Sequence, residues 1–284
     1  MTWQEAQFEM RKALTSLYES REASRITEWI MEFISKKPRI ERIMLSNNIM
    51  MPEEISVWEF SLQALMKGEP VQYVTGNTWF GGHSFEVDQH VLIPRPETEE
   101  LVELIYNENK NRSQLYILDI GTGSGCIPVT LKLKMPSAFV SAIDVSANAL
   151  TIAKKNASAL HADVLFMQMD LFDTTSTLQL PEFDIIVSNP PYIPLSEKKD
   201  MDTHVVDHEP HLALFVQDND PLIFYKTIAI LAKQKLKDKG LLYFETHFKY
   251  ANEVAHHLKE NGFEANVLTD VFGKQRFVKA LWHR

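Results

Sequence analysis

Four consecutive residues, Asn189-Pro190-Pro191-Tyr192, could together hold a planar amino group. The two prolines lack N–H groups and fix two φ angles, and a proline after Asn189 favours an extended backbone at that asparagine. The resulting rigid turn offers two acceptors, the side-chain carbonyl of Asn189 and the backbone carbonyl of Pro190. Each can accept one N–H of an –NH2 group, and the Tyr192 ring can stack on the amide or base plane. We prefer this interpretation to a loop that merely ends a strand, because a glycine motif lies upstream.

That glycine motif is Asp119-Ile120-Gly121-Thr122-Gly123-Ser124-Gly125, between a predicted strand and a predicted helix. Glycines let the backbone approach a ligand closely, and the helix start offers free N–H groups. The Gly-x-Gly-x-Gly spacing differs from the Gly-x-Gly-x-x-Gly of dinucleotide enzymes, and it lacks the Gly-Lys-Ser/Thr of a P-loop. From the residues alone, the motif is either a site for an adenosyl-type cofactor or a tight turn.

Acidic residues also follow the next two predicted strands. Asp144 ends one of them, the usual place for a carboxylate that accepts hydrogen bonds from ribose hydroxyls. Asp144 or Ser146 could instead cap the next helix, and both roles fit one loop. Asp170-Leu171-Phe172 follows the third strand and could hold an adenine ring beside the same crevice, or could simply form a turn.

Alternating strand-like and helix-like segments from Leu115 onward must position these residues. Apolar strands that alternate with helices indicate an α/β domain with a mostly parallel sheet and right-handed crossovers. The predicted strands are 116–120, 139–143, 164–167, 184–188, 240–245 and 277–281, and the predicted helices are 127–133, 147–160, 221–236 and 251–261.

The N-terminal part is predicted to be a small all-α bundle. Apolar residues recur there at steps of three and four, which places them on one face of each helix, and we expect this stripe to form a core. The members are Trp3, Ala6, Met10, Ala13, Leu14 and Leu17, then Ile26, Trp29, Ile30 and Phe33, and finally Trp58, Leu62, Leu65 and Met66.

Around Gly68 the pattern changes to short β-type segments, 71–74, 79–80 and 85–91, separated by Gly76-Asn77 and Gly81-Gly82. Such segments indicate a hairpin or linker. We therefore expect a helical domain at residues 1–75, a β-hairpin linker at 76–94 and the α/β domain at 95–284.

Length and composition limit the class of protein. The 284 residues suit two domains, and 45% hydrophobic with 24% charged residues excludes wholesale disorder. The longest apolar runs fall far short of the roughly 20 residues that a membrane-spanning helix needs, so no membrane association is expected. The N-terminus shows no secretory pattern, and the single cysteine forbids an internal disulfide. A cytoplasmic location is the expectation.

The net charge of −9 argues against a surface that binds nucleic acid in bulk, because Lys and Arg supply that affinity. Residues 1–85 hold 9 Lys and Arg against 11 Asp and Glu, which leaves −7 for residues 86–284. We expect no stable binding of nucleic acid.

The other reactive side chains are not expected to form a functional site. Cys126 begins the helix after the glycine motif, but no Cys–His constellation accompanies it, so we do not expect a nucleophile. His204, His208 and His211, with Asp207 and Glu209, have loose metal-ligand spacing, and we expect a solvated loop and no metal. For the basic cluster Lys36-Lys37-Pro38-Arg39 with Arg42, we expect a solvated loop in preference to a ribosome or tRNA contact.

Asp-x-Gly-x-Gly-x-Gly followed by Asn-Pro-Pro-Tyr resembles class I S-adenosylmethionine-dependent methyltransferases that modify a planar nitrogen. Within that class the chain is similar to the HemK/PrmC family, which methylates the N5 amide of the glutamine in the Gly-Gly-Gln loop of peptide-chain release factors. Further segments carry the likeness over about residues 70–284. They are Pro70-Val71-Gln72-Tyr73 with Gly76, Leu92-Ile93-Pro94-Arg95-Pro96-Glu97-Thr98-Glu99, Asp144 with Ala149-Leu150, and Glu209-Pro210 with Ala213-Leu214. The run from Leu92 to Glu99 is the most family-specific.

The resemblance implies a Rossmann-like methyltransferase domain with a mostly parallel seven-stranded sheet, after a substrate-binding helical bundle. It implies S-adenosylmethionine as the cofactor and class 1 release factors as the protein substrate. Gly121, Thr122, Gly123, Ser124 and Gly125 would line the methionine end of the cofactor, with Asp144 at its ribose and Leu171 at its adenine, and Asn189 would also bind the cofactor. Asn189, Pro190, Pro191 and Tyr192 would bind the substrate glutamine, and Asn189, Pro190 and Tyr192 would be the catalytic residues.

Two segments depart from the family pattern. The family often has a Gly-rich Asp-Gly-Leu segment after Glu-Pro, whereas this chain reads Val216-Gln217-Asp218-Asn219-Asp220-Pro221-Leu222. The fifth strand is usually followed by Glu-x-Gly-x-x-Gln, whereas here Thr246-His247-Phe248 follows Glu245. We therefore borrow no contact from these loops.

Three functions remain to be separated. The first is methylation of the release-factor glutamine. The second is methylation of an exocyclic base nitrogen in DNA or rRNA, which the same four-residue turn could serve once a base is extruded, although the acidic balance disfavours it. The third is a cofactor-binding regulatory module without catalysis, which would not need an intact amide-binding turn.

Overall fold

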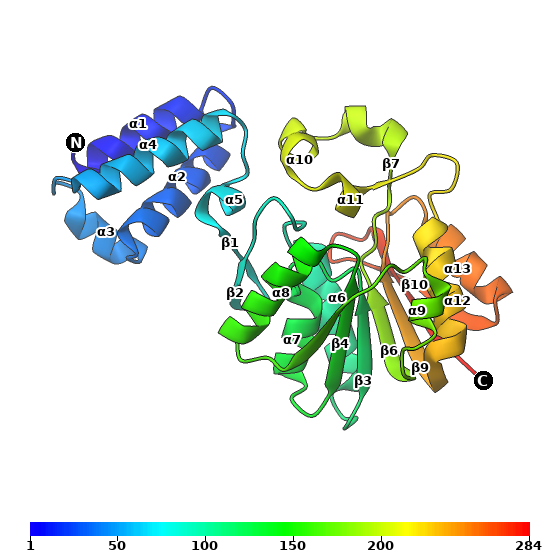
Figure 1. Cartoon of the computed structure of the whole chain (residues 1–284). Coiled ribbons are helices and arrows are strands. Elements are labelled where there is room, and N and C mark those ends of the chain that lie inside the picture. Colours follow the sequence, from blue (N-terminus) through cyan, green and yellow to red (C-terminus); the bar gives the residue numbers. More distant parts are fainter. The chain divides into compact units, whose positions relative to one another are not determined.

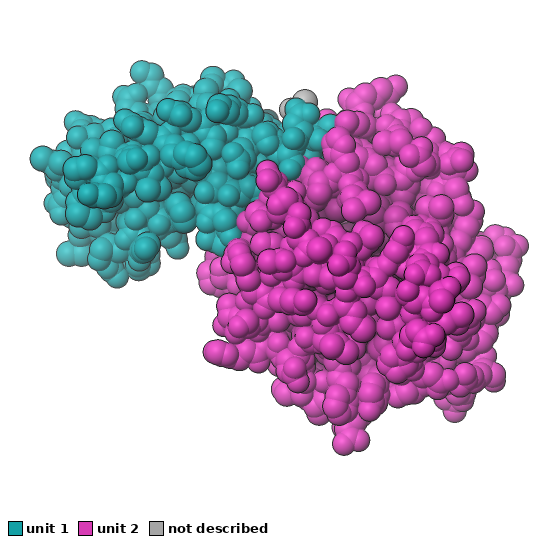
Figure 2. All heavy atoms as spheres, in the orientation of Figure 1, with its two compact units in different colours: residues 1–77, 202–208 teal, residues 78–201, 209–284 magenta. Residues whose placement is uncertain are grey.

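The computed structural model describes the whole chain, residues 1–284, apart from the side chain of Thr203. The chain forms two compact units (Figure 2). Unit 1 comprises residues 1–77 and 202–208, and unit 2 comprises residues 78–201 and 209–284. Among the helices so described, none is long and apolar enough to cross a membrane.

Unit 1 is all-α, as the periodicity predicts. Its helices are α1 (Trp3–Leu14), α2 (Ser20–Ser35), α3 (Arg39–Leu45), α4 (Pro52–Met66), α5 (Val71–Thr75) and, from much later in the chain, α10 (Thr203–His208). Thr2 caps α1 in a capping box with Glu5, and Pro52 occupies the first turn of α4, where its missing N–H costs no hydrogen bond. The core contains Met10, Leu14, Ala23, Ile26, Ile30, Leu65 and Val71, with Trp3, Ala6, Met31 and Met50 in a second cluster.

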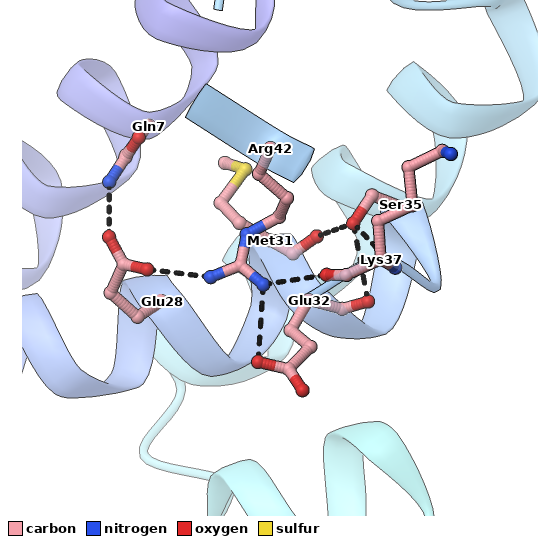
Figure 3. Close-up of polar contacts among 7 residues, drawn as sticks. All are labelled: Gln7, Glu28, Met31, Glu32, Ser35, Lys37 and Arg42. Carbon is pink, nitrogen blue, oxygen red and sulfur yellow. Dashed lines mark hydrogen bonds and ion pairs between the residues drawn. The ribbon is translucent and has the colours of Figure 1, made fainter. Parts of the chain in front are cut away.

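Arg42 links α2 to α3 by polar contacts (Figure 3). Its guanidinium lies 2.6 Å from a carboxylate oxygen of Glu28 and 3.1 Å from one of Glu32, and it donates to the Lys37 carbonyl at 2.8 Å. The side chain is only 9% exposed. The expectation of a solvated basic loop is therefore wrong for Arg42, because two acidic residues of α2 neutralise it.

The segment 71–74 is helical, so the prediction of a β-type segment there is wrong. Val71–Thr75 forms α5, with Pro70 at its N-cap and Gly76 closing it at φ 71°. These are the start and stop signals of a short helix, and burial of Val71 in the unit 1 core outweighs the β preference of valine.

A β-hairpin opens unit 2, as predicted. Strands β1 (Asn77–Phe80) and β2 (His83–Glu86) pair in a two-stranded sheet. The second strand ends at Glu86 and not at residue 91, because the side chain of Asn156 forms hydrogen bonds with the backbone N–H and carbonyl of Glu86. It accepts from the Glu86 N–H at 2.6 Å and donates to the Glu86 carbonyl at 2.9 Å.

The seven-stranded sheet of unit 2 is mixed and mostly parallel, which confirms the predicted fold class (Figure 1). Its order is β10-β11-β9-β6-β3-β4-β5, in which β11 is antiparallel to both neighbours and the other neighbouring pairs are parallel. The strands are β3 (Tyr116–Ile120), β4 (Phe139–Asp144), β5 (Val164–Gln168), β6 (Phe183–Ser188), β9 (Leu236–Glu245), β10 (Phe263–Thr269) and β11 (Gln275–Trp282). No strand is predicted from the sequence where β10 lies.

Helices cover both faces of this sheet and bury its alternating side chains. One core holds Leu118 and Ile120 of β3 against α12 (Ile223–Lys235) and α13 (Ala251–Glu260). The opposite core holds Ile117 of the same strand against α6 (Pro96–Asn109) and α7 (Cys126–Lys134). The remaining elements are α8 (Ala147–Ala159), α9 (Thr174–Thr177), β7 (Ile193–Pro194), the 3-10 helix η1 (Leu195–Asp200), α11 (His211–Leu214) and β8 (Phe215–Val216).

Candidate active site

A cavity of about 420 Å³ lies at the carboxyl ends of β3, β4 and β6 in unit 2. Ligands of open α/β sheets bind at this edge. Nine of the residues singled out from the sequence line it: Gly121, Thr122, Gly123, Ser124, Asp144, Leu171, Asn189, Pro190 and Pro191. Gly125 and Tyr192 do not line it.

The glycine loop is shaped by backbone hydrogen bonds to the next strand. The N–H groups of Gly121 and Thr122 both donate to the Ile143 carbonyl, at 2.9 and 3.1 Å. Gly121 and Gly123 have φ of 76° and 54°, and a Cβ on either would meet no atom within 4 Å. The loop therefore presents open backbone to the cavity, which a ligand could approach closely.

Gly125 allows the start of α7 to pack closely against α8. It has φ of 79°, and a Cβ there would come within 3.0 Å of the Ala153 Cβ and 3.2 Å of the Ala153 Cα on α8. A glycine is thus required where α7 begins against α8.

Asp144 fixes the loop, while Ser146 caps the helix. The Asp144 carboxylate accepts from the Gly123 and Ser146 N–H groups, each at 2.9 Å. The Ser146 hydroxyl accepts from the Ala149 N–H at 3.2 Å, as an N-cap does. Burial raises the pKa of Asp144, and the backbone N–H groups of Ser146, Gly123 and Val145 partly offset this. The two roles predicted for this loop, a helix cap and a carboxylate that could bind a ligand, are therefore compatible.

Leu171 lies at the cavity wall with two aromatic neighbours, of which Phe172 belongs to the predicted segment and Phe224 was not singled out from the sequence. Phe172 and Phe224 line the same cavity, and their rings meet edge to face with centroids 5.3 Å apart. Asp170 holds the turn by accepting from the Phe172 N–H at 2.9 Å. The arrangement gives an apolar slot for a flat ring.

Asn189 is held by a buried hydrogen-bond chain. Its Nδ2 donates to the Thr98 hydroxyl at 3.1 Å, and that hydroxyl donates to a Glu245 carboxylate oxygen at 2.7 Å. The Tyr192 hydroxyl lies 3.5 Å from the other Glu245 oxygen, at the long limit of a hydrogen bond. Burial, together with the charge of Glu245, raises the pKa of Tyr192. Thr98 and Glu245 belonged to recognised segments, but no sequence signal linked them to Asn189.

The two family-specific segments meet at the cavity rim. The buried Glu209 carboxylate accepts from the Ile93 N–H at 3.2 Å and pairs with the Arg95 guanidinium. Pro94 and Pro210, which flank this contact, both line the cavity. The ion pair therefore fixes two segments of the wall that are far apart in sequence.

Asp119 is a buried carboxylate without a compensating partner. It is 0% exposed, and neither oxygen has a hydrogen-bond partner in the described part of the chain. Burial raises its pKa to about 7, the Thr122 side chain partly offsets this, and the charge of Asp144 adds to it. It is the first residue of the glycine motif, and its place in that motif was the only signal for it.

We predict that Asp119→Asn stabilises the ligand-free protein at pH 8. An acid whose pKa is raised on folding lowers stability once the pH exceeds its unfolded value, and the full penalty applies above its folded value of about 7. Each pKa unit corresponds to about 1.4 kcal/mol, so the expected gain at pH 8 is a few kcal/mol and shrinks towards pH 4. Thermal unfolding at both pH values measures it, with the exposed Asp163→Asn as control. An equal effect at both values would contradict this prediction.

The remaining candidates have structural roles. Cys126 is buried, and burial raises its pKa to about 12, which disfavours a thiolate nucleophile. No group of three or more His, Cys, Asp or Glu among the described residues could hold a metal ion. His204 stacks on Tyr18 of unit 1 with centroids 5.0 Å apart, and its Nδ1 lies 2.8 Å from the Gly68 carbonyl oxygen. The expectation of a solvated loop is therefore wrong for His204, since a ring partner and a backbone partner hold it, and for Glu209, whose buried carboxylate pairs with Arg95.

Comparison with known proteins places both units. Residues 98–264 match the family model described as methyltransferase small domain, and residues 5–76 match the PrmC N-terminal domain. The release factor glutamine methyltransferase of Flavobacterium psychrophilum is 42% identical over 272 residues, which are 94% of this chain and 95% of that protein. The enzyme of the same name from Bacteroides thetaiotaomicron is 47% identical over 217 residues, 76% of this chain and 77% of that protein.

A solved structure supports the fold. A 16S rRNA methyltransferase from T. thermophilus, in complex with AdoMet and guanosine, aligns with a TM-score of 0.53. The alignment has 18% identity and covers 73% of this chain and 50% of that one.

Fold and sequence together define a class I methyltransferase, and this class implies S-adenosylmethionine as the methyl donor. More particularly, the chain belongs to the release factor glutamine methyltransferase family.

The residues present fit this cofactor. The buried Asp119 carboxylate has no hydrogen-bond partner among the described residues, it directly precedes a glycine loop that leaves room for a ligand, and it would favour a group of positive charge. The cavity also offers an acidic residue at the end of β4 and an aromatic-walled slot at residues 171–172.

Proposed function

We propose that this protein transfers a methyl group from S-adenosylmethionine to the N5 amide nitrogen of the glutamine in the Gly-Gly-Gln motif of class 1 peptide-chain release factors. Family membership supports the reaction, and one structural observation carries it. Asn189 and Pro190 line the cavity side by side, and Asn189 is held with its Nδ2 turned towards Thr98. Its Oδ1 is thereby left to accept from a substrate amide.

For the cofactor, we propose that the loop from Gly121 to Gly125 takes the methionine end and that Asp144 accepts from the ribose hydroxyls. Leu171, with Phe172 and Phe224, would enclose the adenine ring. When bound, S-adenosylmethionine supplies a methyl group on a positively charged sulfur. The sulfur is the leaving group that an amide nitrogen can displace from the methyl carbon.

For the substrate, Asn189 Oδ1 and the Pro190 carbonyl accept the two N–H bonds of the glutamine amide. An amide nitrogen is a poor nucleophile, since its lone pair is delocalised into the carbonyl. Two fixed acceptors orient it and stabilise the positive charge that develops on it during transfer. Orientation of two bound reactants can supply about 7–11 kcal/mol of the barrier. Pro191 keeps the turn rigid. Tyr192 does not line the cavity, so we propose that it acts from beside the turn, where its hydroxyl lies 3.5 Å from Glu245, and not by stacking on the bound amide.

We further propose a division of labour between the domains as the sequence divides them. Residues 1–75 would recognise the partner protein, 76–94 would link the domains, and 95–284 would carry out the transfer. The match of residues 5–76 to the N-terminal domain of the family supports this division.

The test offers labelled S-adenosylmethionine with a release factor, its Gln→Ala variant, DNA or rRNA. We expect label on the wild-type factor alone. Label on DNA or rRNA would instead favour methylation of a base nitrogen, and no label on any acceptor would favour a regulatory module. Either result would contradict the proposal.

A further inference from the structure

Asn189 is joined to a buried carboxylate through one threonine hydroxyl. The Asn189 Nδ2 donates to Thr98 Oγ1 at 3.1 Å, and Thr98 Oγ1 donates to Glu245 Oε2 at 2.7 Å. Thr98 lies on α6 and lines the cavity, whereas Glu245 ends β9 and does not line it. Both side chains are buried, at 3% and 1% exposure, so water cannot substitute freely for either partner.

The proton count of the threonine makes this chain directional. A hydroxyl has one proton and two lone pairs. While that proton is given to the Glu245 carboxylate, which can only accept, Thr98 can offer nothing but a lone pair to Asn189. The –NH2 end of the Asn189 amide must then face Thr98, and its carbonyl end must face away.

The surroundings of Glu245 set its charge. Burial raises its pKa to about 7, and the hydrogen bond from Thr98 is the largest effect that opposes this. Arg276 on β11 and the Tyr192 hydroxyl also lower the pKa, whereas Glu97 on α6 raises it. Tyr225 on α12 donates to the Glu245 backbone carbonyl at 3.2 Å and leaves the carboxylate untouched.

We propose that Glu245, acting through Thr98, is a positioning residue that fixes which end of the Asn189 amide faces the substrate. This inference rests on the proposed function, since it concerns how that function's amide acceptor is oriented. When Glu245 is protonated, its own proton can point at Thr98 and free the Thr98 proton for Asn189 Oδ1. The Asn189 amide can then turn over and present –NH2 to the substrate –NH2, which cannot accept it.

The main test compares turnover of a release factor by Thr98→Val, Thr98→Ser and Glu245→Gln. We expect Thr98→Val to lower kcat about 10- to 100-fold, because Asn189 loses its partner, and Thr98→Ser to recover it to within about threefold. Glu245→Gln is expected to lower kcat about 5- to 30-fold, because the Gln amide can meet Thr98 with either end. The dissociation constant for S-adenosylmethionine, measured by calorimetry, should change less than about threefold in all three.

Matched controls separate orientation from general damage. Thr130 is a buried threonine of α7 whose hydroxyl has no partner in the described part of the chain, so Thr130→Val should keep wild-type kcat. Glu108 lies on the surface of α6, and Glu108→Gln is the matched control for Glu245→Gln. Circular dichroism establishes that each variant is folded.

The pH profile supplies a readout that a purely structural role would not move. In the wild type, kcat should fall as the pH drops through about 7, because protonation of Glu245 releases the orientation of Asn189. This limb should persist in Thr98→Ser and disappear in Glu245→Gln, which cannot titrate. A limb that is unchanged in Glu245→Gln, or near wild-type kcat in both Thr98→Val and Glu245→Gln, would overturn the inference.

A measurement without substrate keeps the inference separate from the proposed function. Infrared difference spectra across pH 5 to 9 follow the carboxyl band that Glu245→Gln removes. Thr98→Val should move its titration to higher pH, since the hydrogen bond from Thr98 lowers the Glu245 pKa. An unmoved titration would overturn the positioning chain even if the wild type methylates release factors. A wild type that leaves release factors unlabelled would instead overturn the proposed function.

Discussion

Replacement of Asn189 by alanine is expected to lower the turnover of a release-factor substrate at least about a hundredfold, whereas the affinity for S-adenosylmethionine should change less than about threefold. Removing one fixed group that stabilises charge in a transition state commonly costs a factor of about 100–1,000 in kcat. Asn189 supplies one of the two proposed acceptors and lines the cavity. The loss should therefore appear in kcat and not in cofactor binding.

Single-turnover measurement with labelled cofactor checks this prediction, because it isolates the transfer step from product release. The exposed Asn107 of α6 provides the control, and Asn107→Ala should behave as the wild type does. Turnover by Asn189→Ala within about fivefold of the wild type would remove this asparagine from the reaction. A large loss of cofactor affinity would mean that Asn189 acts mainly in the cofactor site.

The placement of the candidate residues at one edge of the sheet follows from local patterns alone. Gly121, Asp144 and Asn189 each end or follow a strand of the parallel part, and carboxyl ends of parallel strands meet at one edge. Apolar strands and glycine or proline turns are strong local signals, so both the sheet and the meeting of these candidate residues at its edge could be predicted from them.

The support behind the site could not be predicted in this way. Thr98 and Glu245 are 147 positions apart, and Thr98 and Asn189 are 91 apart. Their meeting depends on how α6 packs against β9, which no local periodicity records. A threonine in a helix and a glutamate at a strand end are each ordinary when considered alone.

The errors at the level of elements have the same physical origin. The segment 71–74 has β-branched residues but is held as a helix by burial in unit 1 and by the glycine after it. Strand β10, over Phe263–Thr269, has an alternation that breaks at the adjacent apolar residues Val267 and Leu268, and it pairs with β11 at the edge of the sheet. The segment 202–208, from the middle of the catalytic half, packs with the helices of unit 1. Tertiary contacts decided each of these cases.

Replacement of Asp144 by alanine is expected to weaken S-adenosylmethionine binding by a factor of about 10–150. The carboxylate holds the glycine loop by accepting from the Gly123 N–H, and we propose that it also accepts from the ribose. A hydrogen bond to a charged group contributes about 1.5–3 kcal/mol, and each 1.4 kcal/mol is a factor of ten in affinity. Asp144→Asn keeps one acceptor oxygen, so its affinity for S-adenosylmethionine should lie between those of the wild type and Asp144→Ala.

Calorimetric titration with S-adenosylmethionine measures the effect, and Asp173→Ala is the matched control. Asp173 caps the short helix α9, accepts from the Thr175 and Ser176 N–H groups, and does not line the cavity. Its removal should cost about 0.5–2 kcal/mol of stability and leave the affinity unchanged. If Asp144→Ala matched this control, with lower stability but wild-type affinity, Asp144 would be a structural residue of the loop and the ribose would be held elsewhere.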